Sequence, residues 1–498
     1  MLGPGPAAEL GDPPRRPALD PSGLQAARAG RATGKARPRC DRPPDVVLSR
    51  RRGRALRSEG ASMNVVLSAL ATANPKRYAT QEETYAFMAA HFALQPQEKE
   101  LYRQLLMEGP IRGRYFAVDV DEEICSQDPD RLIRRFETHG RRLGAEAART
   151  ALARAGLKPA DIEGLIVNTC TGYLCPGLSS YRVEDLGLPA FTSVLDLMGM
   201  GCGGALPNLE AACRMIQSGA RRTVLCLSVE VCSATFFLGP DPDLIVSNSI
   251  FADGAAAAVL TADRDADDPA GPSRCPACRV PMGAYSPRGE IGTARDQGQR
   301  GLGIPPMAPG LEADPGNAAL LSGSFPEANR EIGGPGGLQV PATTPPLRLP
   351  SQGALRFLDF ESVTLPRYRD QLRYVTRQGR LRNVLTRNVP VIGARAVAQA
   401  VHRLLDRRRL APGAIDWWVV HPGGTQILNA VQRQLGLTPE RLRFSYEVFR
   451  NYGNMSSPSV LFVLDRILRE ARPRLHQTGL LLSFGAGFTA FAALVEFR

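Results

Sequence analysis

The sequence predicts an α/β protein built from two duplicated βαβ-type halves, in which central sheets are covered by helices. Short apolar runs alternate with amphipathic stretches along most of the chain, which is the pattern of strands buried between helices. The same order of segments also occurs twice, about 250 residues apart. Because a duplicated unit places equivalent positions opposite each other about a pseudo-twofold axis, residues from both halves are expected to meet in one pocket.

The repeat is visible in three pairs of matching segments. Each copy opens on Leu-x-Pro-x-x-Ile, passes through a glycine-led turn and ends on an apolar tail. The pairs are residues 157–162 with 410–415, 201–202 with 453–454, and 223–228 with 478–483. The turn of the first copy carries Cys202 and the turn of the second carries Asn454. The repeat therefore predicts that these two side chains face each other.

The individual elements follow from the spacing of apolar residues. Residues 64–70 are typical of an opening strand, and residues 130–155 repeat Leu, Ala and Arg at helical intervals. The first half continues with strands at 165–169, 193–198 and 223–229, a turn at 173–177 and a helix at 205–217. The second half repeats this order with a helix at 394–407, a strand at 417–420, a helix at 456–469 and a strand at 480–484.

Two segments depart from this pattern. Residues 1–62 are rich in Arg, Pro, Ala and Gly without apolar periodicity, which favours a disordered basic tail or a natural start at Met63. Residues 264–352 are dense in Pro and Gly, and we interpret them as a disordered insertion. The folded protein is then expected to consist of an N-terminal half, residues 63–263, and a C-terminal half, residues 353–498.

Charge and composition exclude several classes of protein. The net charge is +12, but residues 1–62 hold 13 Lys and Arg against six Asp and Glu, so +7 belongs to that segment alone. The remaining +5 is spread thinly and has no motif support, which argues against a nucleic-acid partner. No apolar run approaches the roughly 18 residues that span a bilayer. We therefore expect a protein without a membrane span.

The ten cysteines do not form a disulfide framework in a chain of 498 residues. Most of those in the two halves lie in apolar segments, as expected for thiols in a reducing compartment, so a cytoplasmic location is expected. Cys275 and Cys278 have zinc-knuckle spacing but lack a second Cys or His pair nearby. No metal site is predicted.

Cys202 is the candidate nucleophile. It lies in Gly-Met-Gly-Cys-Gly-Gly, where a strand turns into a helix. Glycines permit the tight turn, and the positive end of a helix favours a thiolate, which is the form that takes an acyl group from a thioester. The alternative interpretation is a small buried residue in a glycine-rich turn.

His421 and Asn454 are the candidate partners of this cysteine. His421 ends a buried strand and precedes Pro-Gly-Gly-Thr, so it is placed to project into a cleft, polarise a thiol and donate a hydrogen bond to a thioester carbonyl. Asn454 occupies the repeat position of Cys202, where an amide donor could stabilise an enolate. A structural His and a capping Asn are the alternatives. The other four histidines, including His139, are expected on the surface or in loops.

Together these motifs resemble the type III polyketide synthases, the chalcone and stilbene synthase-like family, in their bacterial type. The matching strips are residues 198–203, 235–240, 251–256, 421–424, 452–457 and 484–487. The resemblance covers roughly residues 63–263 and 354–498. It implies a thiolase-like fold, a homodimer, and a Cys-His-Asn centre that acts on CoA thioesters without a cofactor.

The resemblance also implies roles for the three candidates. Cys202 would hold the growing polyketide as a thioester, while His421 and Asn454 would bind the thioester carbonyl and promote decarboxylation of malonyl-CoA. Phe237 would match the family's gatekeeper phenylalanine at the junction between the CoA tunnel and the reaction cavity. An ordinary core aromatic is the alternative for Phe237.

The remaining candidate residues concern the substrate cavity. Small Cys170 and Thr171 suit a roomy pocket for long acyl starters. Cys175 stands where plant members have a methionine that reaches into the partner subunit. Gly487 belongs to the C-terminal glycine loop, in which Ala486 replaces the family's proline.

The basic residues that grip the CoA phosphates in plant members are poorly matched. Arg103, Arg112 and Arg114 are the candidates in this chain.

The expected function is therefore an iterative acyltransferase. It would condense an acyl-CoA starter with malonyl-CoA and cyclise the product to a pyrone, a resorcinol or a related aromatic. A single-condensation β-ketoacyl synthase of the same fold is the alternative enzyme. A non-catalytic binding or scaffold protein that uses the basic tail is the alternative from another class.

Overall fold

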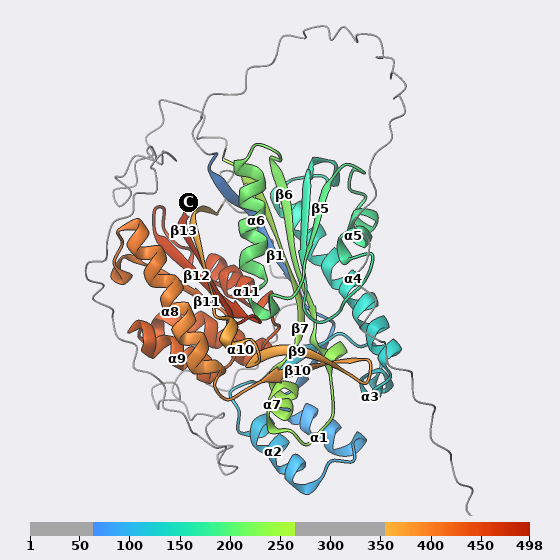
Figure 1. Ribbon diagram of the computed structural model, residues 1–498. Coiled ribbons are helices and arrows are strands. Elements are labelled where there is room, and N and C mark those ends of the chain that lie inside the picture. The colour runs from blue at the N-terminus through green and yellow to red at the C-terminus, as the bar shows by residue number, and fades with distance from the viewer. Residues whose placement is uncertain (1–62, 264–353) are drawn as a thin grey trace, which may run out of the picture. The chain divides into compact units, whose positions relative to one another are not determined.

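The computed structural model of the chain describes residues 63–263 and 354–498 (Figure 1). The predictions for residues 1–62 and 264–352, including the Cys275 and Cys278 pair, lie outside the described residues. So does Gly353, with which the expected C-terminal half begins.

The described part contains a mixed sheet of nine strands, in the order β11-β12-β13-β8-β1-β7-β6-β4-β5. β4 is parallel to β5 and β6, and β11 is parallel to β12, whereas the other neighbours are antiparallel. The strands are β1 Val65–Ala73, β4 Gly164–Asn168, β5 Ser193–Leu197, β6 Thr223–Val231, β7 Asp253–Ala262, β8 Leu355–Thr364, β11 Trp417–Val420, β12 Thr478–Gly485 and β13 Thr489–Phe497.

The strand order confirms the predicted duplication. β1-β7-β6-β4 in the first half matches β8-β13-β12-β11 in the second, while β5 has no counterpart among the described strands of the second half. β1 and β8 pair antiparallel across the join, with Val65 opposite Phe357. The matching Leu-x-Pro segments form equivalent 3-10 turns, Pro159–Asp161 before β4 and Pro412–Ala414 before β11.

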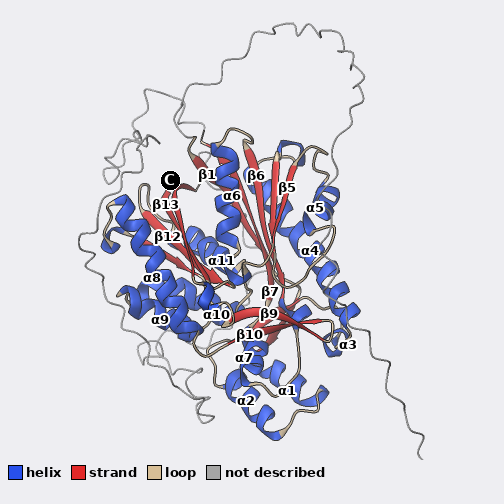
Figure 2. Cartoon of the chain, viewed as in Figure 1, coloured by secondary structure: helices blue, strands red, loops and turns tan. Residues whose placement is uncertain are grey.

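Helices cover both faces of the sheet (Figures 1 and 2). α6 (Ala205–Gln217) and α11 (Ser459–Arg466) share one apolar core with strands of both halves. α4 (Pro129–Ala155) and α5 (Leu178–Leu186) cover the first half in a second core. α8 (Val389–Arg408) and α9 (Thr425–Leu435) cover the second half in a third. No helix within residues 63–263 or 354–498 is both long and apolar enough to cross a membrane.

Capping residues explain why the longest helix agrees with its prediction. The side chain of Asp128 accepts a hydrogen bond from the backbone N–H of Arg131, and Pro129 occupies the first turn of α4. Gly156 ends the helix with a φ of 67°, in the left-handed region that glycine adopts readily.

Two helices differ from their predicted bounds. α8 begins at Val389 rather than 394, because Pro390 is tolerated in a first helical turn. α11 begins at Ser459 rather than 456, because Ser456 has a φ of 59° and cannot start a right-handed helix. The chain then continues as a short π-helical segment, Ile467–Ala471.

Shorter helices and strands complete the described part of the chain. They are β2 Arg77–Thr80, α1 Gln81–His91, α2 Pro96–Met107, β3 Gly113–Phe116, α3 Asp121–Cys125, α7 Pro242–Ile250, β9 Leu372–Arg377, β10 Arg380–Leu385 and α10 Arg443–Tyr452. α1, α2 and α7 pack around a separate small core that includes Met88, Tyr102 and Ile245.

The surface or loop position expected for His139 is wrong. His139 lies on α4 and is 2% exposed, with Nε2 3.1 Å from a carboxylate oxygen of Glu123. An imidazole can be buried when a carboxylate accepts its hydrogen bond, and single residues in an amphipathic pattern do not show this pairing.

Candidate active site

Cys202 lies in a 3-10 turn, Gly201–Gly203, between β5 and α6. Gly201 has a φ of 55°, which a residue with a side chain adopts only with strain. The thiol is buried at 8% exposure, and Ser456 Oγ donates a hydrogen bond to its Sγ at 3.3 Å. A residue of the second half therefore contacts the candidate nucleophile of the first.

The C-terminal glycine loop packs directly on this turn. A Cβ atom at Gly485 would overlap the carbonyl oxygen of Met200, so only glycine permits this approach. Gly487 follows two residues later, with a φ of 128°. The end of β12 thereby fixes the position of the Cys202 turn.

Asn454 lies where the two halves meet, as the repeat predicts. Its backbone N–H donates to the carbonyl of Ile250 at 2.8 Å, and it forms a parallel bridge with Phe251. Its side-chain Oδ1 accepts from the backbone N–H of Ser456 at 2.8 Å. Its Nδ2 donates to the carbonyl of Gly423 at 3.1 Å, which connects it to the loop that carries His421.

His421 follows β11 and is 1% exposed. Neither ring nitrogen has a hydrogen-bond partner among the described residues, and the ring meets Phe484 edge-on with centroids 5.8 Å apart. Burial lowers the pKa of His421 to about 3, because the charged form is desolvated. The imidazole is therefore neutral at physiological pH and has both nitrogens available to a ligand.

The environment of Cys202 acts against the thiolate that the helix start is expected to favour. Burial raises the pKa of Cys202 to about 12, and the nearby charge of Glu230 raises it as well. Hydrogen bonds from Ser456 and Asn454 lower it by less. Desolvation outweighs the helix terminus here, so the candidate nucleophile is favoured as a thiol.

Glu230 at the end of β6 is the main functional candidate that sequence reasoning missed. It is fully buried, and burial raises its pKa. Its carboxylate accepts hydrogen bonds from both halves of the chain. The donors are Thr169 Oγ1, the backbone N–H and Sγ of Cys170, Thr171 Oγ1, Ser456 Oγ and Ser457 Oγ. A single acidic residue in an apolar strand was the available signal.

Cys170 and Thr171 occupy different positions in this network. Cys170 is half-buried, and its Sγ lies 3.3 Å from Glu230 and 3.2 Å from Ser456 Oγ, next to Cys202. Thr171 is fully buried; its Oγ1 donates a hydrogen bond to Glu230 and accepts one from the backbone N–H of Val231. Cys170 therefore belongs to the hydrogen-bonded cluster around Cys202, Ser456 and Glu230, whereas Thr171 contacts Glu230 from the other end of the same turn.

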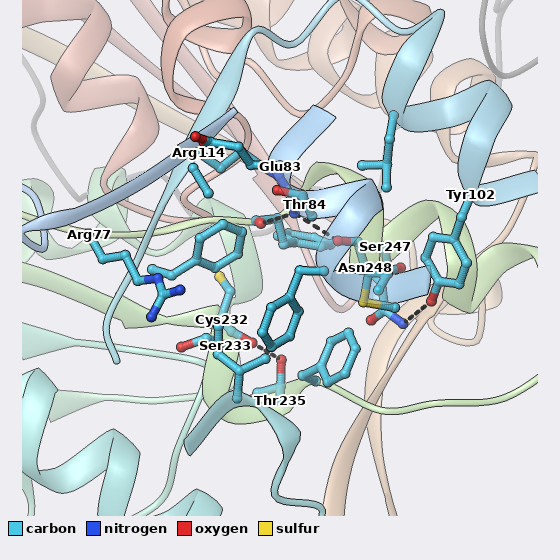
Figure 3. A pocket seen from close by; sticks show the side chains of 18 of the residues that line it. Arg77, Glu83, Thr84, Tyr102, Arg114, Cys232, Ser233, Thr235, Ser247 and Asn248 are labelled. Atoms are coloured by element: carbon cyan, nitrogen blue, oxygen red, sulfur yellow. Dashed lines mark hydrogen bonds between the residues drawn. The ribbon is translucent and has the colours of Figure 1, made fainter. Parts of the chain in front are cut away.

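A largely apolar cavity of about 370 Å³ adjoins the cluster, between α1, α2, α7 and the end of β6. Phe251, the bridge partner of Asn454, lines it. Cys232 lines it too, and the pKa of that thiol is raised by burial and by the charges of Asp253, Glu230 and Cys202. Figure 3 shows Cys232 and Thr235 on one side of the cavity and the hydrogen-bonded pair Tyr102 and Asn248 on the other.

The structure places Phe237 outside this cavity. Its ring packs under the guanidinium of Arg380, 4.1 Å from the ring centroid, at a separate open surface pocket. Phe236 and Phe251 line the cavity instead. Two adjacent phenylalanines in one loop gave the sequence no means of deciding which ring turns inward.

The three arginines proposed for CoA have different surroundings. Arg114 is fully buried and donates to Gln81 and to the carbonyls of Asn248 and Phe251, so it braces the cavity wall and is not available to a phosphate. Arg103 is partly exposed and pairs with Glu100 and Glu108. Arg112 is exposed.

Tyr374 on β9 is another residue that sequence reasoning missed. The pKa of its phenol is raised by burial and by the charges of Cys170, Cys232, Cys202 and Glu230. The tyrosine therefore reaches the same cluster from the β9–β10 hairpin. Cys175, in contrast, is exposed.

Two family models match the chain, one in each half. Residues 119–276 match the FAE1/Type III polyketide synthase-like protein model, and residues 364–496 match the C-terminal domain of chalcone and stilbene synthases. A 3,5-dihydroxyphenylacetyl-CoA synthase of Streptomyces toyocaensis is 30% identical over 402 residues, covering 79% of this chain and 82% of that protein. An alpha-pyrone synthesis polyketide synthase-like protein of Mycobacterium tuberculosis is 24% identical over 438 residues, covering 86% of this chain and 91% of that protein.

Solved structures agree on the fold. PKS-I from the brown alga Ectocarpus siliculosus superposes with a TM-score of 0.65 at 23% identity, covering 89% of this chain and 100% of the other. The 1,3,6,8-tetrahydroxynaphthalene synthase of Streptomyces coelicolor superposes with a TM-score of 0.65 at 20% identity, covering 87% of this chain and 99% of the other. The expected thiolase-like fold is confirmed. With a relative at 30% identity spanning most of both chains, this chain belongs to the type III polyketide synthases.

Proposed function

We propose that this polyketide synthase is an acyltransferase that loads an acyl group from a CoA thioester on Cys202 and extends it with malonyl-CoA. The observation that carries the proposal is the series of hydrogen bonds that runs from Cys202 of one half through Ser456 and Asn454 of the other to the Gly423 carbonyl of the His421 loop. Relatives named for a dihydroxyphenylacetyl-CoA, a tetrahydroxynaphthalene and an alpha-pyrone support cyclisation to an aromatic or pyrone product.

In the loading step, neutral His421 accepts the proton of the Cys202 thiol. The resulting thiolate attacks the thioester carbonyl of the starter, and CoA leaves as its thiol after taking up the proton. A low pKa for His421 and a high one for Cys202 disfavour a resting ion pair. The proton transfer is therefore coupled to substrate binding.

In the extension step, His421 and Asn454 donate hydrogen bonds to the thioester carbonyl of malonyl-CoA. Loss of CO₂ leaves an enolate whose oxygen keeps these two donors. The enolate carbon attacks the acyl thioester on Cys202, the Cys202 thiolate leaves, and the extended acyl group remains on CoA. The free ring nitrogens of His421 support this role, and so does the placement of Asn454 Nδ2 toward the His421 loop. No cofactor takes part in either step.

The apolar cavity is proposed to hold the starter chain. Its lining includes Phe87, Met88, Leu106, Phe236 and Leu244, side chains that suit a hydrocarbon rather than a highly charged group. A bound acyl tail would pass Cys232 on its way from Cys202.

A homodimer is proposed for the whole protein. Large apolar side chains are exposed around β5, an edge strand of the sheet, with Phe191 at 87% and Tyr173 at 71% exposure. A second copy covering this region would remove that area from water.

Mass spectrometry of products from a panel of acyl-CoA starters with malonyl-CoA tests the proposal. Polyketides extended by more than one malonyl unit, and cyclised, are expected from the full chain and from a version beginning at Met63. A product with a single added unit from every starter would favour the single-condensation synthase. Unchanged malonyl-dependent product formation by Cys202→Ala would contradict the mechanism, and no turnover with any starter would favour a binding protein.

A further inference from the structure

Two buried polar side chains that line the apolar cavity have hydrogen-bonding atoms without partners. They are Arg135 on α4, 2% exposed, and Asn383 on β10, 7% exposed. Neither Arg135 Nη2 nor Asn383 Oδ1 has a hydrogen-bond partner within residues 63–263 and 354–498. Buried donors and acceptors are nearly always satisfied in native proteins, so an unpaired donor and an unpaired acceptor on one cavity indicate a missing polar ligand.

Arg135 is held in place by a hydrogen bond through Nη1 and by an ion pair through Nε, which also lacks a hydrogen-bond partner among residues 63–263 and 354–498. Nη1 donates to the carbonyl of Ser233 at 2.7 Å, and Nε lies 3.4 Å from a carboxylate oxygen of Glu123. Ser233 belongs to the short turn Cys232–Thr235, which forms one wall of the cavity (Figure 3). The Arg135 side chain is therefore anchored beside that wall.

Asn383 lies on β10, a strand that contacts the same turn. β10 packs on the Cys232–Thr235 turn, as α4 does. The hairpin that carries Asn383 also carries Tyr374, whose phenol is influenced by the charges of the Cys202 cluster. The side chains with the unpaired donor and acceptor thus come from two elements that pack on one turn of the cavity proposed to hold the starter.

The charges around Arg135 decide what kind of group fits. Burial lowers the pKa of its guanidinium, while the charges of Glu123 and Asp253 raise it. Both carboxylates would repel an anionic ligand, and one of them already pairs with the guanidinium. What remains at Arg135 is the capacity to donate a hydrogen bond, and at Asn383 the capacity to accept one.

We propose that the cavity selects a starter whose acyl chain carries a hydroxyl group at the end remote from the thioester. The hydroxyl oxygen accepts a hydrogen bond from Arg135 Nη2, and its proton is donated to Asn383 Oδ1. This inference rests on the proposed function, because it assigns the far end of the starter bound at Cys202. It identifies Arg135 and Asn383 as specificity-determining residues.

The test compares three acyl-CoA series of matched chain lengths, ending in a methyl, a hydroxyl or a carboxylate group. The kcat/KM of starter-dependent CoA release is measured at saturating malonyl-CoA for each. A hydroxyl-ended starter is expected to exceed its methyl-ended match about tenfold at the preferred length, as a hydrogen bond to a charged donor allows. The carboxylate-ended starter is expected to be the poorest of the three.

Variants assign the preference to the two side chains. Arg135→Met and Asn383→Leu should each reduce the hydroxyl preference at least about threefold while still elongating the methyl-ended starter. Arg134→Met is the matched control, because it removes an exposed guanidinium one residue away on α4 and should keep the preference. Asn383→Leu keeps the test decisive if Arg135→Met fails to fold.

The outcomes separate this inference from the proposed function. Equal use of methyl- and hydroxyl-ended starters, or a preference for the carboxylate, overturns the inference while leaving the synthase intact. A hydroxyl preference that survives in both variants also overturns it. If the wild-type enzyme elongates none of the starters, the proposed function itself fails.

Discussion

At the scale of single residues, burial sets the protonation states of the site. Cys202 and His421 both lie in the interior, and desolvation moves their pKa values in opposite directions, to about 12 and about 3. Both groups therefore rest in their neutral forms. This state favours a nucleophile that is activated when substrate arrives.

The first prediction concerns the reactivity of the Cys202 thiol. Because only the thiolate is alkylated, iodoacetamide should modify Cys202 slowly near neutral pH and faster as pH rises toward about 12. Exposed Cys175 in the same sample provides the control and should react much sooner. Peptide mass spectrometry after timed alkylation measures both sites, and equal rates near pH 7 would contradict a buried thiol.

The second prediction concerns His421 and acid stability. Its folded pKa of about 3 lies below the usual value of 6.5, so the unfolded chain binds a proton that the folded chain does not. The contribution of neutral His421 to the free energy of unfolding is fully present above pH 6.5. This contribution is lost as pH falls toward 3, by about 1.4 kcal/mol per pH unit for one group. His421→Gln should reduce the dependence of the free energy of unfolding on pH, measured by urea unfolding at several pH values across that range. An unchanged slope would show that His421 titrates normally.

At the scale of elements, capped and periodic segments are the ones the sequence predicts well. α6 is found at its predicted residues, and α4 begins within one residue of its prediction. The β9–β10 hairpin could not be predicted, since arginines interrupt its short apolar pattern. The sequence predicts Ser456 as the start of a helix, whereas its left-handed backbone and its bond to Cys202 follow only from tertiary contacts.

The same distinction applies to the candidate site. The repeat predicts the meeting of Cys202 and Asn454, because equivalent positions of a duplicated unit converge. It is silent about Glu230, whose function depends on hydrogen-bond donors distant in the chain. It also could not choose between Phe236 and Phe237, because the direction of a loop side chain is set by packing.

The third prediction tests how the glycine loop positions the nucleophile. A methyl group at Gly485 would overlap the Met200 carbonyl, so Gly485→Ala should destabilise the fold by about 1–3 kcal/mol. The displaced Cys202 turn should also lower kcat/KM about 100-fold. Gly413→Ala is the control, because a Cβ there meets no neighbouring atom. Denaturant unfolding and turnover check both, and a silent Gly485→Ala would refute the close contact.

At the scale of the whole molecule, the two halves are proposed to divide the chemistry. The first half contributes Cys202 and Glu230, and the second contributes His421, Asn454 and Ser456. The halves are joined through the pairing of β1 with β8 and through a core shared by α6 and α11. A substitution that disturbs the contact between the two halves should therefore displace the residues of both halves that meet at the site.

The fourth prediction concerns the proposed homodimer. Phe191→Asp places a charge in the exposed apolar region beside β5 and should shift the protein from dimer to monomer in sedimentation. Leu475→Asp is the matched control, since Leu475 is 62% exposed and lies far along the chain from that region. A monomeric wild-type protein would contradict the proposal.

The most direct test of the central claim is to locate the acyl group on the protein. The enzyme is mixed with an acyl-CoA starter in the absence of malonyl-CoA, digested, and examined by mass spectrometry. The acyl mass is predicted on the peptide containing Cys202, with its loss on addition of malonyl-CoA as elongated product appears. Acylation of another residue, or malonyl-dependent product from a protein that never carries an acyl group on Cys202, would contradict the account.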